Sequence, residues 1–156
     1  FNGGAGAVTI LTASNSLGGI FGSFFVLFTS KIKSKGIVVL YATLFYGILL
    51  IFFGLASSLI IGTIIIALLG ASDAVGMTTR QSIVQLTTPN EMRGRAVSFH
   101  SVTAMTANNI GHFEVGVMSD IIGAEKTMIL GGILSILVVI IIWKTFSGVS
   151  SYKYSD

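Results

Sequence analysis

RQSIVQLTTPNEMRGR, residues 80–95, is the one long polar segment that lies between apolar runs of this chain. Inside it, the residues from Thr88 to Glu91 have the pattern of a helix start. Thr88 is suited to the N-cap, Pro89 to the first helical position, and Glu91 to the returning bond of a capping box. We therefore predict a short helix within a loop between two membrane-spanning segments.

Two arginines follow that predicted helix at once. Arg93 and Arg95 stand at the mouth of the apolar run that begins at Ala96, and Gly94 between them permits a sharp change of direction. Fixed positive charges at this place mark the boundary between membrane and water.

The composition favours a membrane protein. Of 156 residues, 53% are hydrophobic and 10% are charged, with nine basic and six acidic side chains, and the mean hydropathy is +0.91. A soluble domain of this length needs more charge to cover its exterior. The basic residues stand singly between apolar runs, as anchors to lipid headgroups do, so no nucleic-acid partner is expected.

Cysteine is absent, so neither a disulfide nor a thiolate metal site is expected. The chain opens at Phe1 without a charged region ahead of an apolar one, which predicts no signal peptide and indicates a fragment.

The apolar runs predict an all-α membrane fold with five transmembrane helices in one partial domain. About 20 residues at roughly 1.5 Å each cross a hydrocarbon core of about 30 Å. The run from residue 37 to residue 77 is twice that length, so we place a turn at Ser57-Ser58. The predicted spans are residues 7–28, 37–56, 59–79, 96–118 and 127–143, with a loop at 119–126 and a polar cytoplasmic tail at 145–156.

The first span carries a ridge of small residues. Ser14, Gly18 and Gly22 recur every four residues, which allows another helix to approach closely.

Counting basic residues predicts the orientation. Five spans place eight lysines and arginines on one side and only Lys126 on the other. By the positive-inside rule the eight face the cytoplasm, which puts the C-terminus inside.

The span at 96–118 is unusually polar and holds most of the candidate functional residues. Ionisable groups within a membrane are costly, so Glu114, His100 and His112 are candidates for proton coupling, together with Asp73 of the span at 59–79. A carboxyl that only braces two helices is the alternative for Glu114. Asn108, Asn109 and Asn15 of the first span are candidates for lining a substrate path, with hydrogen bonding to a neighbouring helix as the alternative.

Asp73 is the one charge between residues 37 and 77, and we expect it to be buried and paired. Arg80 is nearest in sequence, while Arg93 and Arg95 are further possibilities. A structural ion pair is one interpretation; the other is a cytoplasmic gate made by Arg80, Glu91, Arg93 and Arg95.

Enzyme chemistry is not indicated. His100 and His112 are twelve residues apart, without the i, i+4 partner of a helix-borne zinc site, and Gly3-Gly4-Ala5-Gly6 lacks the surroundings of a phosphate-binding loop. We predict neither a metal site nor a cofactor.

Taken together, these residues resemble the C-terminal half of a major facilitator superfamily transporter, most closely the bacterial branch with enterobactin exporters and macrolide-type efflux pumps. The residues that carry the resemblance are Asp73, Arg80, the run from Thr88 to Arg95, Asn109-Ile110-Gly111, Glu114, Gly116, Ile122-Gly123-Ala124 and Gly131-Gly132.

The resemblance implies a twelve-helix fold of which these spans are helices eight to twelve, so that the N-terminal half of the same chain is missing and is a partner. Two departures matter. The loop from Thr29 to Gly36 lacks the acidic residue of the family pattern, and His112 stands where a second acid is expected.

The resemblance therefore implies a proton-coupled exporter, or antiporter, of small amphipathic molecules that works by alternating access in a bacterial inner membrane. The bilayer and the substrate are its other partners. The alternative is a non-transporting membrane scaffold or subunit whose helices serve only packing.

Overall fold

The computed structural model describes residues 4–29 and 34–145, and these form five α-helices without a strand. The helices are α1 (Gly4–Thr29), α2 (Lys35–Leu55), α3 (Leu59–Thr87), α4 (Arg93–Ile122) and α5 (Ala124–Thr145). The all-α membrane fold predicted from the sequence is confirmed. The predicted tail at 145–156 lies, apart from Thr145, outside the described residues.

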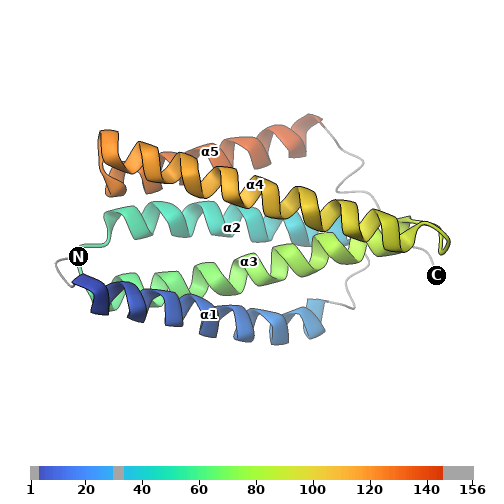
Figure 1. The fold of residues 1–156 in the computed structure, drawn as a ribbon, viewed down its shortest axis with the longest axis horizontal. Helices are drawn as coiled ribbons and strands as arrows, with labels where there is room; N and C mark the ends of the chain where they lie inside the picture. The colour runs from blue at the N-terminus through green and yellow to red at the C-terminus, as the bar shows by residue number, and fades with distance from the viewer. Residues whose placement is uncertain (1–3, 30–33, 146–156) are drawn as a thin grey trace.

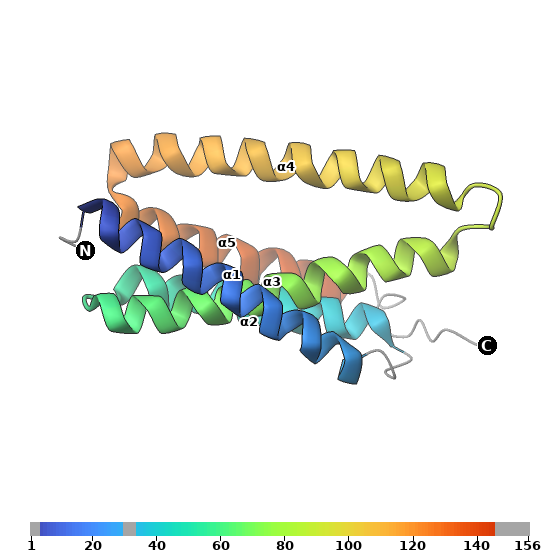
Figure 2. The same cartoon turned by 60° about the horizontal axis from the view of Figure 1, so that its bottom comes forward.

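The helices run up and down, with α3 in the middle of the packed part (Figure 1). α1 and α2 both pack on α3, and α5 packs on the far side of α2. α4 approaches the others only weakly, and Figure 2 shows it held away from the bundle and joined to it at its two ends. The packed unit is thus α1, α2, α3 and α5.

Glycines allow the packed helices to touch backbone to backbone. A Cβ at Gly18 or Gly22 of α1 would overlap the backbone of Ala67 or Ala71 on α3. The predicted ridge on the first span is therefore a packing surface. Gly132 of α5 meets α2 at Gly47 in the same way, and Gly54 of α2 meets the start of α5. Such close approach favours association in a bilayer because lipid tails are as apolar as leucine.

The core is small, and large apolar side chains point outward. The buried apolar residues are Ala7, Leu40, Leu49, Leu69, Val75 and Val139. Phenylalanines of α1 and α2 such as Phe24, Phe28, Phe45 and Phe52 are exposed. A surface covered by large apolar side chains suits a protein that is surrounded by hydrocarbon.

Polar side chains within the spans mostly satisfy themselves locally. Hydroxyls of Thr12, Thr43 and Thr63 donate to carbonyls one turn back in their own helices. Ser72 differs, because its Oγ donates to the Ala42 carbonyl oxygen at 2.8 Å and so links α3 to α2.

The helix boundaries confirm some expectations and correct others. α2 ends at Leu55 and α3 begins at Leu59, so the turn at Ser57-Ser58 is confirmed. The loop predicted at 119–126 is wrong, because α4 continues to Ile122 and α5 begins at Ala124. Gly123 makes the whole reversal with φ of 88°, a conformation that a residue with a Cβ rarely adopts.

The short helix predicted from Thr88 is also wrong. α3 continues to Thr87, and Thr88 follows its C-terminus with Oγ1 donating to the Val84 carbonyl oxygen at 2.7 Å. The next residues form a turn in which the Met92 amide donates to the Pro89 carbonyl oxygen at 3.0 Å. Gly94 lies inside α4 and changes no direction. The capping pattern assigns the Thr88 hydroxyl to the start of a new helix. In the structure this hydroxyl bonds instead to the last turn of α3.

Four of the described helices, α1, α2, α3 and α5, are long and apolar enough to cross a membrane. α4 has 30 residues, or about 45 Å of helix, which is ample length. Because of its polar residues, α4 is not apolar enough to be counted with these four helices. The fifth predicted span is therefore supported by the length of α4 and not by its hydropathy.

We predict that Gly18→Ala loosens the contact between α1 and α3. Its Cβ has no space against the Ala67 carbonyl, and overpacking costs about 1–3 kcal/mol. The measurement is the unfolding free energy in detergent micelles titrated with sodium dodecyl sulfate.

Gly19→Ala is the matched control, because the nearest atom to its Cβ is the Gly70 oxygen at 3.9 Å. It should leave stability unchanged or raise it slightly, since alanine favours helix. Equal effects of the two substitutions would contradict the close contact.

Candidate functional site

α4 contains no buried residue along its whole length, although it is the most polar helix in the chain. Its half-buried residues include Val97, Ala104, Gly111 and Met118, which are spaced seven apart and so lie on one face. That face turns toward the other helices, and its small residues leave space there.

The opposite face of α4 is apolar. Phe99, Val102, Ile110 and Phe113 follow one another at steps of three, eight and three residues and so lie on one face, and Phe99 and Phe113 are 76% and 75% exposed. An apolar stripe of this kind suits contact with lipid or with another apolar helix.

Polar residues occupy the two flanks between these faces. Asn108 and His112 are one turn apart on one flank and are exposed, with Asn109 beside them. Glu114 is also exposed, but it is only two residues from His112 and so points in nearly the opposite direction. The structure therefore separates the candidates on α4 into two groups.

His100 is half-buried on the side of α4 that carries Glu114. The two residues are fourteen apart, which places them about 21 Å from each other along the helix. A direct proton exchange between them is excluded by that separation. His100 is nearer than Glu114 to the inner face of α4 and to the basic end of the bundle.

Asp73 of α3 is exposed, which corrects the expectation of a buried carboxylate. No ion pair joins Asp73 to Arg80 within the described ranges, and Nε of Arg80 donates to the Gly76 carbonyl oxygen at 3.1 Å. α3 also continues past Arg80 for seven residues, so Arg80 is not at the end of its helix.

Asn15 lies at the crossing of α1 and α3. Its backbone oxygen and Oδ1 are so close to Gly70 that a Cβ there would overlap both. This contact agrees with a packing role for Asn15, and Gly70 is one turn from Asp73.

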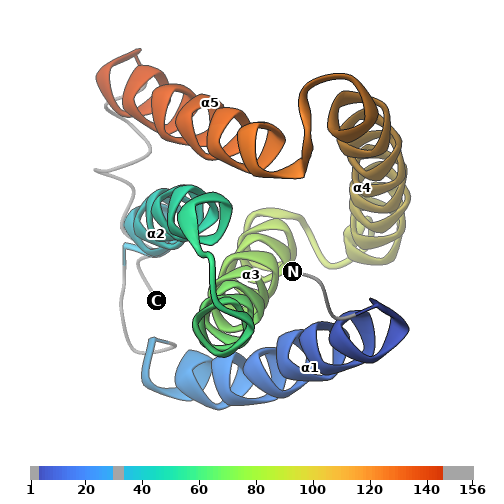
Figure 3. The same cartoon turned by 90° about the vertical axis from the view of Figure 1, so that its left-hand side faces the viewer.

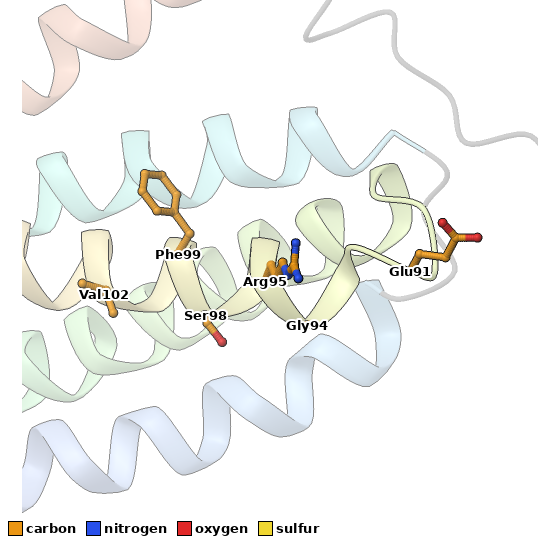
Figure 4. Close-up of a pocket in the computed structure, with 6 residues that line it drawn as sticks. All are labelled: Glu91, Gly94, Arg95, Ser98, Phe99 and Val102. Carbon is orange, nitrogen blue, oxygen red and sulfur yellow. The ribbon is translucent and has the colours of Figure 1, made fainter.

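The four residues of the predicted gate fall in three places. Arg80 lies along α3, while Glu91 and Arg95 border an open hollow of about 670 Å³ at the start of α4. Figure 4 shows the Glu91 carboxylate at the loop, directed away from Arg95. Arg93 lines a different pocket, with Lys35 of α2. The structure does not bring these residues together as one latch.

The described residues contain no group of three or more His, Asp or Glu side chains able to hold a metal ion. The polar residues of α4 are hydrogen-bonding and titrating groups spread along a helix of membrane length. Such an arrangement suits the passage of a proton or polar solute along α4.

Sequence reasoning missed a set of residues on the other side of the bundle. An apolar groove of about 690 Å³ is formed there by α1, α2 and α3. Aromatic residues at Phe21, Phe25, Tyr41 and Phe45 were a signal, but each predicted span was interpreted alone. Only the packing of three helices reveals the groove.

The fold and the polar α4 define an integral membrane protein built of helices, in which one helix is specialised for polar contacts. Comparison with known families makes this more specific. A family model described as transmembrane secretion effector, of the major facilitator type, matches residues 1–150. The chain belongs to this family of membrane transporters. No curated protein and no solved structure matches it.

We predict that the Asn108 flank of α4 is in contact with water in the membrane, since amides and imidazoles do not face lipid. The chain has no cysteine, so a single one can be introduced. Asn108→Cys should react with a charged, water-soluble thiosulfonate in membrane vesicles.

Phe113→Cys, on the apolar face, should not react at a comparable rate. Both positions are exposed in the isolated chain, so detergent-unfolded protein provides the reference for full reactivity. If Phe113→Cys reacted and Asn108→Cys did not, the assignment of the faces would be reversed.

Proposed function

We propose that this chain carries part of a secondary active transporter that exports small amphipathic molecules in exchange for protons, by alternating access. The observation that supports it is α4, a helix of membrane length with no buried residue and with Asn108, Asn109, His112 and Glu114 exposed. Family membership supplies the transporter class.

The physical argument concerns what can surround α4. An ionisable group in hydrocarbon is costly, so the flanks of α4 require water or protein around them. α1, α2, α3 and α5 do not supply it, because they leave the middle of α4 uncovered. Further helices of the same transporter, including an N-terminal half, would cover the inner face and enclose a solute path.

Glu114 is the best candidate for proton coupling. It is the only acidic residue in the central part of α4, since Asp120 lies near the end of that helix. Gly111 and Ala107, one and two turns away, leave space for water or substrate. Asn108 and Asn109 on the other flank are the proposed substrate contacts, and His112 beside them is a further candidate for proton coupling.

The distribution of charges favours one orientation. The turn at 88–92, the start of α2 and the end of α5 lie at one end of the bundle (Figure 1). Lys35, Arg93, Arg95 and Lys144 all occur there, and by the positive-inside rule this end faces the cytoplasm. A multi-pass protein of the bacterial inner membrane fits this proposal.

We predict that Glu114→Gln reduces efflux driven by a proton gradient to background, because the amide cannot carry a proton. Folding and substrate binding should be retained, since the amide is the same size and remains polar. The measurements are efflux from vesicles with an imposed gradient and equilibrium binding of the substrate.

Asp120→Asn is the matched control, being an exposed acid of the same helix near its end, and it should keep full efflux. On the scaffold alternative, Glu114→Gln is silent and Glu114→Leu destabilises the protein. Normal efflux by Glu114→Gln at all pH values would end the proton-carrier proposal.

A further inference from the structure

The groove between α1, α2 and α3 lies on the side of the bundle that faces away from α4. On α3 its floor includes Leu68, Ala71 and Val75. Asp73 and Arg80 project from the opposite side of the same helix, as the helical period of 3.6 residues requires. The groove is therefore separate from the proposed transport path and opens toward the surrounding bilayer.

The walls of the groove are aromatic and aliphatic. Phe21 and Phe25 of α1 form one wall, and Tyr41 and Phe45 of α2 form the other. Ser72 is the one hydroxyl from α3, and it already donates to the Ala42 carbonyl oxygen. A long hydrocarbon chain fits such a surface, and a polar solute does not.

A second, polar pocket of about 240 Å³ lies further along the same side of α3. Its lining residues are Lys35, Ser82, Gln85, Leu86 and Arg93. Two positive charges thus converge from the first turns of α2 and α4. Ser82 Oγ donates to the Thr78 carbonyl oxygen at 2.9 Å, which leaves the Gln85 amide as the neutral donor.

The two pockets are continuous in register. Leu68 and Val75 of the groove are spaced by seven residues, and Ser82 of the polar pocket is seven further on, so all three share one face of α3. On α2, Lys35 lines the polar pocket and Ile37, two residues later, lines the groove. Val75 and Ser82 are about 10 Å apart along the axis.

We propose that this composite site binds an anionic glycerophospholipid of the surrounding membrane. Lys35, Arg93 and Gln85 bind the phosphate, and an acyl chain lies in the groove between the phenylalanines of α1 and α2. Charge complementarity supports this occupant, because basic residues at the membrane boundary attract anionic headgroups. The inference requires only that the chain is in a membrane and does not depend on its transport mechanism.

Such a lipid would connect helices that otherwise touch little. Arg93 begins α4, which is weakly packed, whereas Lys35 and Gln85 belong to the packed helices α2 and α3. A phosphate shared among them fixes the start of α4 against the bundle.

The only tryptophan of the chain provides a reporter. Trp143 of α5 contacts Tyr41 edge to face, with ring centroids 5.6 Å apart, and Tyr41 lines the groove. We would reconstitute the protein in phosphatidylcholine vesicles with increasing phosphatidylglycerol that carries bromine on its acyl chain. Trp143 fluorescence should be quenched saturably, and at lower mole fractions than with brominated phosphatidylcholine.

Lys35→Gln combined with Arg93→Gln should lower the apparent affinity for brominated phosphatidylglycerol about 25-fold, since each basic residue contributes about a factor of five. Lys35→Arg should retain the affinity. Lys126→Gln is the control, because it removes one charge at the other end of the bundle. Circular dichroism and a melting curve verify that each variant is folded.

Three results would overturn the proposal. Equal quenching by the two brominated lipids would mean only a general lipid annulus. An unchanged affinity in the folded double variant would exclude the basic pocket as the headgroup site. Relief of quenching by inorganic phosphate, at an ionic strength matched with chloride, would indicate a site for a soluble anion instead of a lipid.

Discussion

Close backbone contact between helices is the interaction on which the structure depends. In a bilayer, burying leucine against leucine gains little over leaving it in lipid, so helices associate where small residues let them approach. Gly18 and Gly22 provide this between α1 and α3, and Gly47 and Gly132 provide it between α2 and α5. The packing of α2 on α3 joins the two pairs, with Ser72 donating to Ala42 across the contact.

α4 lacks that kind of contact with the other described helices, and the proposed function draws on this difference. Of the glycines within α4, neither Gly111 nor Gly116 has a neighbouring atom within 4 Å of an added Cβ. A helix that is not packed by its small residues has those residues available for something else. In the proposed transport path this space would hold a moving solute and the water that accompanies protons.

The sequence predicts the fold class well because hydrophobic length in a membrane is a strong constraint. Residues 37–77 could not be one span, and Ser57-Ser58 is the turn. The ridge at Gly18 and Gly22 was also predictable, because four-residue spacing of small residues has one main use. The ends of α4 were not predictable: Gly123 alone replaces an eight-residue loop, and Thr88 bonds backward to α3. A local capping pattern does not show whether the Thr88 hydroxyl bonds to the end of the preceding helix or to the start of the next one.

The sequence predicts which helix carries the candidate site, but it does not predict how the site's residues are arranged around that helix. The polar residues of the span at 96–118 were evident from sequence, whereas their division into two flanks follows from the face that α4 turns to the bundle. The sequence left Arg80, Arg93 and Arg95 open as partners of Asp73. Among the described residues Arg80 does not pair with Asp73, since seven residues span about 10 Å of helix, and Nε of Arg80 donates to the Gly76 carbonyl oxygen. The groove and the basic pocket each combine residues from three helices, and sequence read span by span does not bring such residues together.

Hydrogen exchange along the chain tests most directly the claim that α4 borders water while α3 is packed. With the transporter reconstituted in vesicles, mass spectrometry of peptides from residues 96–118 and 59–79 would compare the two helices. The account predicts that amides of α4 exchange at least about tenfold faster than those of α3, because few buried contacts oppose opening of α4 and water reaches its flanks. Equal and strong protection of both helices would contradict it.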